Sequence, residues 1–152
     1  MTTEGKLMGK AETAVNTFSQ GFNCTQAVLS AFSQDFGLDP VMAYKVAGPF
    51  GGGMGHLGKT CGAVTGAFMA LGLKYSKTRS DGTESHHEAF AMVRQFVKEF
   101  ESKHGSIECR ELLGFNINDR QAFREAIQNG IPQKVCPLLV ADAAAMVEKL
   151  LE

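Results

Sequence analysis

Apolar residues recur at three- and four-residue steps along much of this 152-residue chain, and this periodicity constrains the fold more than any other feature. The clearest stripe lies within residues 89–100 and is typical of an amphipathic helix. Ser85 followed by Glu88 predicts a capping box at its start, and Gly105 predicts its end. Alanine is frequent (17), whereas valine and isoleucine together number 14, which favours helices over strands. The residues of the stripe are Ala89, Met92, Val93, Phe96, Val97 and Phe100.

Six further helices are expected from the same periodicity and from capping residues. Asn23 with Gln26 opens one helix, and Asp39 before Pro40 places an N-cap ahead of a proline at the first helical position. No segment reads convincingly as a strand. We therefore expect one all-α domain over residues 1–152, a multi-helix bundle. The remaining helices are expected at about 11–19, from Thr60 to about Leu73, from Asp119 to Gly130, and from Cys136-Pro137 onward.

The segment from Gly48 to Gly66, GPFGGGMGHLGKTCGAVTG, holds eight of the 17 glycines of the chain. We expect a glycine-rich loop that leads into a helix whose N-terminus carries Cys61. Within that helix Gly62, Gly66 and Ala70 form a ridge of small residues, which allows a neighbouring backbone to approach closely. Absent side chains in the loop are also expected to leave N–H groups free to approach a sulfur or a cluster.

Residues 53–60, GMGHLGKT, match the P-loop pattern, in which backbone N–H groups, a lysine and a hydroxyl hold a phosphate and its magnesium. Lys59 and Thr60 fit locally, and LLVAD, which ends at Asp142, resembles a Walker B strand. However, a P-loop follows a buried strand, and VAGPFGG cannot form one. A P-loop-like nucleotide binder is therefore the weakest interpretation.

Four cysteines, separated by 37, 48 and 27 residues, form no C-x-x-C pair, so the spacing predicts neither a zinc ribbon nor a thioredoxin motif. Each nevertheless falls at or near a predicted helix start. The partial positive charge of a helix N-terminus stabilises a thiolate, so we expect lowered pKa values and one shared thiolate site. The four residues are Cys24, Cys61, Cys109 and Cys136.

The flanking sequences of these cysteines resemble the C_GCAxxG_C_C family of redox-active or metal-binding proteins. The likeness covers nearly the whole chain through GFNCTQAV (21–28), the segment 51–73, ECRELLG (108–114) and Cys136. The core motif of the family is C-G-A-x-x-G, which is CGAVTG here, starting at Cys61. The resemblance implies that the four cysteines of this chain are the four characteristic cysteines of the family.

Three functions are compatible with such a site. In the first, the four thiolates bind an iron–sulfur cluster, preferably [2Fe–2S], or another metal (iron or zinc), and the redox role requires iron because zinc keeps one oxidation state. The second is a cofactor-free thiol–disulfide relay in which Cys61 attacks and Cys24 resolves. The third is a non-catalytic helical interaction domain with buried cysteines. His56, in the glycine-rich loop, is a further candidate metal ligand.

Charge and hydropathy restrict the partners. A formal net charge of −1 with scattered Lys and Arg gives no basis for nucleic-acid or acidic-membrane binding. Residues 1–18 are polar and lack the apolar core of a signal peptide, and no apolar run approaches the roughly 18 residues of a membrane span. We expect a cytoplasmic protein with reduced thiols and a redox partner protein. A homodimer through an apolar helix face is a further expectation, although no heptad run specifies it.

Overall fold

The computed structural model describes residues 9–78 and 87–152, and within these ranges the chain is all-helical, 74% of it in helices and without strands. The predicted fold class is thus confirmed. Two short 3₁₀ helices follow α2 and α3, at Gln34–Phe36 and Gly48–Phe50. The α-helices are α1 (Lys10–Ser19), α2 (Cys24–Ser33), α3 (Pro40–Ala47), α4 (Gly62–Tyr75), α5 (His87–His104), α6 (Cys109–Leu113), α7 (Arg120–Gln128) and α8 (Ile131–Leu150).

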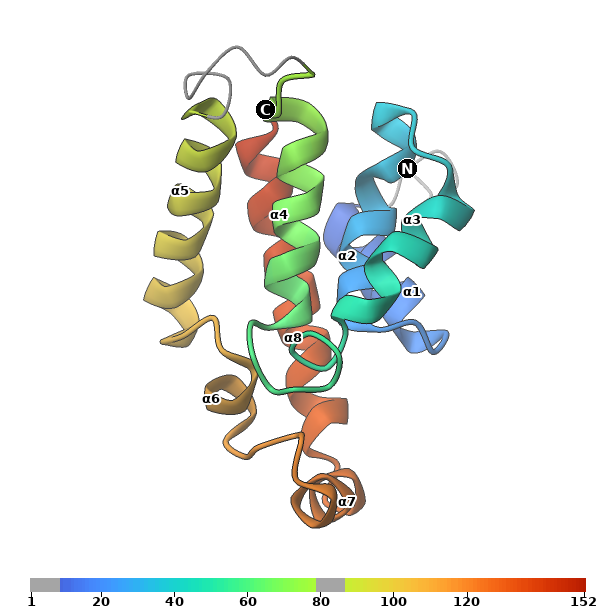
Figure 1. Cartoon of the computed structure of the whole chain (residues 1–152), viewed down its shortest axis with the longest axis vertical. Coiled ribbons are helices and arrows are strands. Elements are labelled where there is room, and N and C mark those ends of the chain that lie inside the picture. The colour runs from blue at the N-terminus through green and yellow to red at the C-terminus, as the bar shows by residue number, and fades with distance from the viewer. Residues whose placement is uncertain (1–8, 79–86) are drawn as a thin grey trace, which may run out of the picture.

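Helices α4 and α8 form the middle of the molecule, with α5 on one side and α1 to α3 on the other (Figure 1). The short helices α6 and α7 lie together at one end, beside the glycine-rich loop. The main core lies among α1, α2, α4, α5 and α8. Its largest fully buried side chains include Phe32, Phe96, Phe100, Leu71, Val64 and Val147.

Several predicted helix starts are confirmed by their caps. The Asn23 side chain accepts a hydrogen bond from the Gln26 N–H, and the Gln26 side chain accepts one from the Asn23 N–H, which completes a capping box on α2. Asp39 caps α3 ahead of Pro40, and Asp119 caps α7. The capping box expected at Ser85 lies outside the described residues.

Two predicted helix starts are wrong. Helix α4 begins at Gly62 with Cys61 as its N-cap, because Thr60 forms an isolated antiparallel bridge with Glu108. Helix α8 does not begin at Cys136-Pro137. It begins at Ile131, after Gly130 (φ 71°), and Pro132 occupies the first turn, where a missing N–H costs nothing.

Pro137 therefore lies inside α8. A proline in a helix interior cannot donate to the carbonyl four residues earlier, here that of Gln133, and its ring crowds that carbonyl. The helix consequently loses one hydrogen bond in its second turn, next to Cys136.

The predicted small-residue ridge brings α2 and α4 into close contact. A methyl group added at Gly66 would lie 2.8 Å from the Thr25 carbonyl oxygen and 3.0 Å from Val28 Cβ, and one at Gly62 would lie 2.8 Å from Thr25 Oγ1. The buried hydroxyls of Thr25 and Thr65 share a hydrogen bond of 3.2 Å across this contact. Both helices therefore begin side by side at the same end of the bundle.

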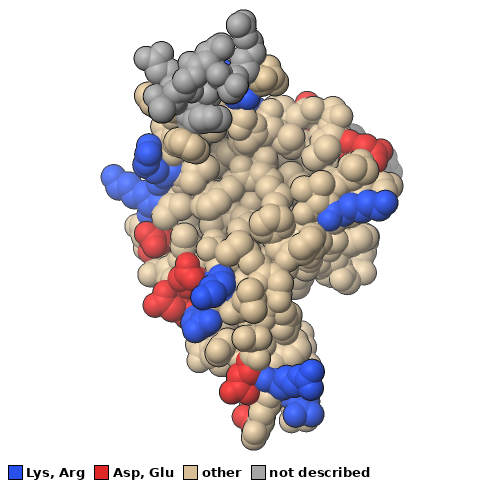
Figure 2. All heavy atoms as spheres, in the orientation of Figure 1, with Lys and Arg blue, Asp and Glu red and all other residues tan. Residues whose placement is uncertain are grey.

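Charged side chains on the face shown in Figure 2 gather in mixed positive and negative groups near its edges, and its middle is uncharged. Among the described residues, no single helix has the length and apolar character to cross a membrane. By length and composition alone, α7 and α8 reach the extent and apolar character of a membrane span only when they are taken together. The two helices are bent by 86° at their junction.

The α2–α4 contact gives a first test. We expect Gly66→Ala to lower the free energy of unfolding by about 2 kcal/mol, because the new methyl group overpacks against backbone. Gly72→Ala in the same helix is the matched control, since its methyl group meets only the Ser76 side chain at 3.4 Å. It should be neutral or stabilise by up to about 1 kcal/mol. Urea unfolding measures both, and equal effects would contradict the close contact.

Candidate functional site

The four cysteines line one cavity of about 240 Å³, although they lie far apart in the sequence. They come from four different helices, α2, α4, α6 and α8, or from the residue that caps them. All four are free thiols. The rest of the wall is largely apolar, and it includes Phe18, Leu112, Leu113, Ile117, Phe123, Ile127, Pro132 and Leu139.

The cavity lies between two apolar clusters. Cys24 and Cys61 belong to the main core, whereas Cys109 and Cys136 belong to a smaller cluster built on α6, α7 and the start of α8. Cys24 and Cys136 are half-buried, and Cys61 and Cys109 are buried, with 4% and 7% of their surface exposed. The site therefore joins these two clusters.

Three of the four cysteines occupy helix starts as predicted. Cys24 is the first residue of α2, Cys61 is the N-cap of α4, and Cys109 is the first residue of α6. Cys136 is different, because it is the sixth residue of α8 and lies in the second turn. The prediction that all four thiols fall at helix N-termini is thus wrong for Cys136.

The bridge between Thr60 and Glu108 makes Cys61 and Cys109 neighbours in space. The Cys61 N–H donates to the Ile107 carbonyl at 2.8 Å, and the Cys109 N–H donates to the Lys59 carbonyl at 2.6 Å. These two bonds connect the end of the glycine-rich loop to α6. A pairing of only one residue from each segment thus positions two cysteines that lie 48 residues apart in sequence.

The glycine-rich loop turns in a left-handed conformation beside the cavity. Residues 52–56 all have φ between +62° and +71°, including the non-glycine residues Met54 and His56. Left-handed backbone costs an L-residue roughly 1–2 kcal/mol, so the surrounding contacts must stabilise it. The N–H groups of residues 54–59 each donate to a carbonyl within the loop or just before it.

These hydrogen bonds within the loop contradict the expectation of free N–H groups and argue further against a phosphate-binding loop. The N–H groups of residues 54–59 are already committed to carbonyls, so they are not free to approach a sulfur. They cannot wrap a phosphate either, and no strand precedes the loop within the described residues. Asp142, the end of the Walker-B-like segment, lies in α8 and pairs with Lys103 at 3.0 Å and His104 at 2.9 Å.

Instead, the loop packs on Cys109. A methyl group at Gly53 would lie 2.8 Å from Cys109 Cβ and 2.6 Å from the Lys59 nitrogen, so only glycine allows this approach. The Arg110 guanidinium donates to the carbonyls of Leu57 and Gly58, at 3.2 Å each. The glycines therefore serve the cysteine site through close packing.

Burial dominates the acid–base behaviour of the two buried thiols. Desolvation raises the pKa of Cys61 to about 12 and that of Cys109 to about 11. The backbone N–H groups of Ala63 and Val64 lower the Cys61 pKa only part of the way back. The expectation that helix starts lower the thiol pKa values is thus wrong for Cys61 and Cys109, because loss of hydration outweighs the helix dipole.

Cys24 and Cys136 are joined by a side-chain hydrogen bond. This bond, followed by burial, raises the pKa of Cys24 well above its ordinary value, so the expected lowering is wrong for Cys24 as well. The same bond lowers the pKa of Cys136, because it stabilises that thiolate. Cys136, the cysteine away from a helix start, is therefore the most acidic of the four thiols.

His56 also lines the cavity, although its side chain is exposed. Its ring meets the edge of the Phe123 ring at a centroid distance of 4.7 Å and an angle of 90°. Phe123 and Ile127 of α7 also line the cavity, although their helical spacing in the sequence does not predict a place in this site. Their place in the cavity wall follows from the sharp bend between α7 and α8, for which Gly130 was the sequence signal.

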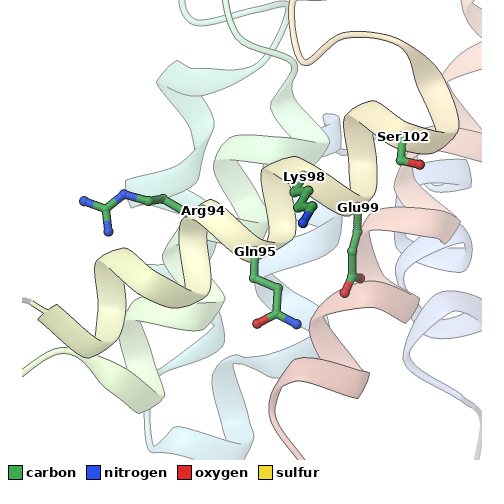
Figure 3. A pocket seen from close by; sticks show the side chains of 5 residues that line it. All are labelled: Arg94, Gln95, Lys98, Glu99 and Ser102. Atoms are coloured by element: carbon green, nitrogen blue, oxygen red, sulfur yellow. The ribbon is translucent and has the colours of Figure 1, made fainter.

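A larger hollow of about 620 Å³ lies on the outer face of α5 (Figure 3). Its lining comes from one helix and contains no thiol, so it is separate from the cysteine cavity. The residues are Arg94, Gln95, Lys98, Glu99 and Ser102.

An all-helical domain with four free cysteines around one cavity defines a four-cysteine helical protein. The chain belongs to the C_GCAxxG_C_C family, because the family model described as "Putative redox-active protein (C_GCAxxG_C_C)" matches residues 22–150. The resemblance predicted from the sequence is thereby confirmed. The comparisons with curated proteins and with solved structures found no match.

The contact between loop and cysteine can be tested with two glycines. Gly53→Ala and Gly55→Ala both place alanine in left-handed backbone, but a methyl group at Gly55 meets only the Pro49 oxygen at 4.0 Å. We expect Gly53→Ala to lose about 1–3 kcal/mol more in urea unfolding, through overpacking on Cys109 and the Lys59 nitrogen. Equal losses of unfolding free energy would show that the strain of the left-handed backbone, and not the contact with Cys109, accounts for the glycine at Gly53.

The thiol pKa values predict an order of alkylation in the reduced, metal-free protein. The iodoacetamide rate at Cys136 should reach half its maximum below pH 9, whereas Cys61 and Cys109 should require pH near 12 and 11. Cys24→Ala removes the hydrogen-bond donor, so the Cys136 midpoint should move to higher pH.

Ser19→Ala, which changes an exposed hydroxyl outside the cavity, is the control for that variant. It should leave all four profiles unchanged. Peptide mass spectrometry after a short pulse of reagent reports each cysteine separately. A Cys61 that reacts first at neutral pH would contradict this assignment.

Proposed function

We propose that the four cysteines form one redox site that binds an iron–sulfur cluster, preferably [2Fe–2S], or a metal ion, for electron transfer to a partner protein. The observation that carries the proposal is the convergence of four thiols from four helices on a single cavity. The membership of the chain in a family described as redox-active supports it.

The chemistry of the donors suits such a group. Thiolates are soft ligands that favour iron–sulfur clusters and zinc, and four of them complete a tetrahedral or cluster site. When bound, a cluster supplies one-electron exchange that the thiols alone do not provide. His56 remains a candidate additional ligand, because it lines the same cavity.

Electrostatics also favours a cation in this cavity. Among the residues that the structure describes, no Lys, Arg, Asp or Glu lines it, so neighbouring sulfurs face one another without a compensating charge. The proximity of Cys61, Cys109 and Cys136 accordingly raises the Cys24 pKa, beyond the larger effects of the hydrogen bond and burial. A bound cation would remove this repulsion.

The thiols must rearrange to hold a metal. Within the described part of the chain, no three His, Cys, Asp or Glu side chains are placed to hold a metal ion as they stand. A cavity of about 240 Å³ leaves room for the cysteine side chains to rotate inward. The hydrogen bond between Cys24 and Cys136 would be replaced by ligation of both sulfurs.

Metal and sulfide analysis of protein purified without oxygen tests the proposal. We expect iron and acid-labile sulfide in fixed ratio to protein, with visible absorption that dithionite bleaches. Replacement of any one of the four cysteines by serine should remove most of the iron, because each supplies one ligand. His56→Ala should keep the iron if four thiolates suffice.

A colourless, metal-free protein that takes up neither iron nor zinc on reconstitution would refute this function. Thiols that react only after unfolding, again without metal, would support the non-catalytic interaction domain. Far-UV circular dichroism of each serine variant separates loss of a ligand from loss of the fold.

A further inference from the structure

Two of the four cysteines are more accessible than the others. Cys24 and Cys136 are the two half-buried cysteines of the set, both line the cavity, and each perturbs the pKa of the other. Cys61 and Cys109 are buried. The more accessible pair therefore differs from Cys61 and Cys24, the pair expected from the sequence for a relay.

The two partners lie on different helices at the cavity, Cys24 on a fixed turn of α2 and Cys136 on a weakened turn of α8. The capping box at Asn23 fixes the first turn of α2, and Cys24 Cβ lies 3.0 Å from the position that a methyl group on Gly62 would take. By contrast, Pro137 leaves the second turn of α8 without one hydrogen bond. That weakened turn carries Cys136 and can shift toward Cys24 at low cost.

We propose that Cys24 and Cys136 form a reversible disulfide by thiol–disulfide exchange with a disulfide substrate, while Cys61 and Cys109 stay reduced. The proposal rests on the proposed function only in locating redox chemistry at this cavity. It needs no metal. The apolar, uncharged wall of the cavity favours a disulfide whose flanking groups are neutral over one that carries several charges.

The exchange runs in two balanced steps. One thiolate of the pair attacks a sulfur of the substrate R–S–S–R, which forms a mixed disulfide and releases R–S⁻. The second thiol then loses its proton and attacks the protein sulfur of the mixed disulfide, which forms the bond between Cys24 and Cys136 and releases the second R–S⁻. Two protein thiols are oxidised, one substrate disulfide is reduced, and the two protons go to the two released thiolates.

The disulfide would also control metal binding at the same site. A sulfur in a disulfide has no thiolate charge to donate, so oxidation of the pair leaves only Cys61 and Cys109 as ligands. Metal binding and disulfide formation are therefore mutually exclusive. The bond would join the main core to the cluster of α6 and α7, so the oxidised protein should resist unfolding more strongly.

Peptide mapping tests the proposal directly, because trypsin places each cysteine on a separate peptide. Those peptides are 11–45, 60–74, 104–110 and 135–149. Reduced, metal-free full-length protein is treated with hydroxyethyl disulfide, quenched in acid, alkylated and digested. We expect peptides 11–45 and 135–149 to be linked, and Cys61 and Cys109 to be alkylated in the same molecules.

Single variants then trap the intermediate. Cys24→Ser should stop at a mixed disulfide of hydroxyethanethiol on Cys136, and Cys136→Ser should stop at Cys24. Circular dichroism must show the helical fold in both. As a second readout, the oxidised wild-type protein should unfold at higher urea concentration than the reduced protein, and this shift should vanish in both variants.

A disulfide between any other pair, or no disulfide in excess hydroxyethyl disulfide, would overturn the proposal. Its failure is separable from that of the metal function. Protein that takes up neither iron nor zinc on reconstitution, but links peptides 11–45 and 135–149, refutes the cluster and supports the disulfide. Protein that binds iron, but whose metal-free form gives no link between these two peptides, supports the cluster and refutes the disulfide.

Discussion

The close approach of α2 and α4 is the contact on which the cysteine site depends. Gly62 and Gly66 leave no side chain between the helices, so α4 rests on the backbone at Thr25 and both helices begin at one end of the bundle. Because Cys24 and Cys61 lie at these neighbouring helix starts, both line the same cavity. The bridge at Thr60 and Glu108 then adds Cys109, and α8 brings Cys136.

Desolvation and the helix dipole oppose each other at these thiols, and burial is the stronger effect. About half a charge at a helix start cannot replace the hydration of an anion that lies beside other sulfurs. Cys61 and Cys109 are accordingly neutral near pH 7, although both lie at helix starts. Only Cys136 gains acidity, and it does so through one hydrogen bond with Cys24. The thiols of such a site lose their protons readily only when a bound cation neutralises the negative charge on sulfur or a new covalent bond to sulfur removes it.

Most of the fold was predictable, because caps and periodicity are local. Asn23, Asp39 and Asp119 each cap the helix predicted for them. The start of α8 was not, since Pro132 and Pro137 are both acceptable near a helix start and only packing selects between them. Residues 53–60 match a phosphate-binding pattern, but the N–H groups of residues 54–59 bond to carbonyls within and just before the loop.

The sequence by itself determined the helical class, the small-residue face of α4 and the four cysteines as the residues of interest, because these depend on neighbours along the chain. Only the tertiary structure decided which thiols meet. Residues 24 and 136 line one cavity because α2 packs against α8, and no spacing encodes that pair. The thiol pKa values likewise follow from burial, which depends on all the surrounding helices and not on the capping position of one cysteine.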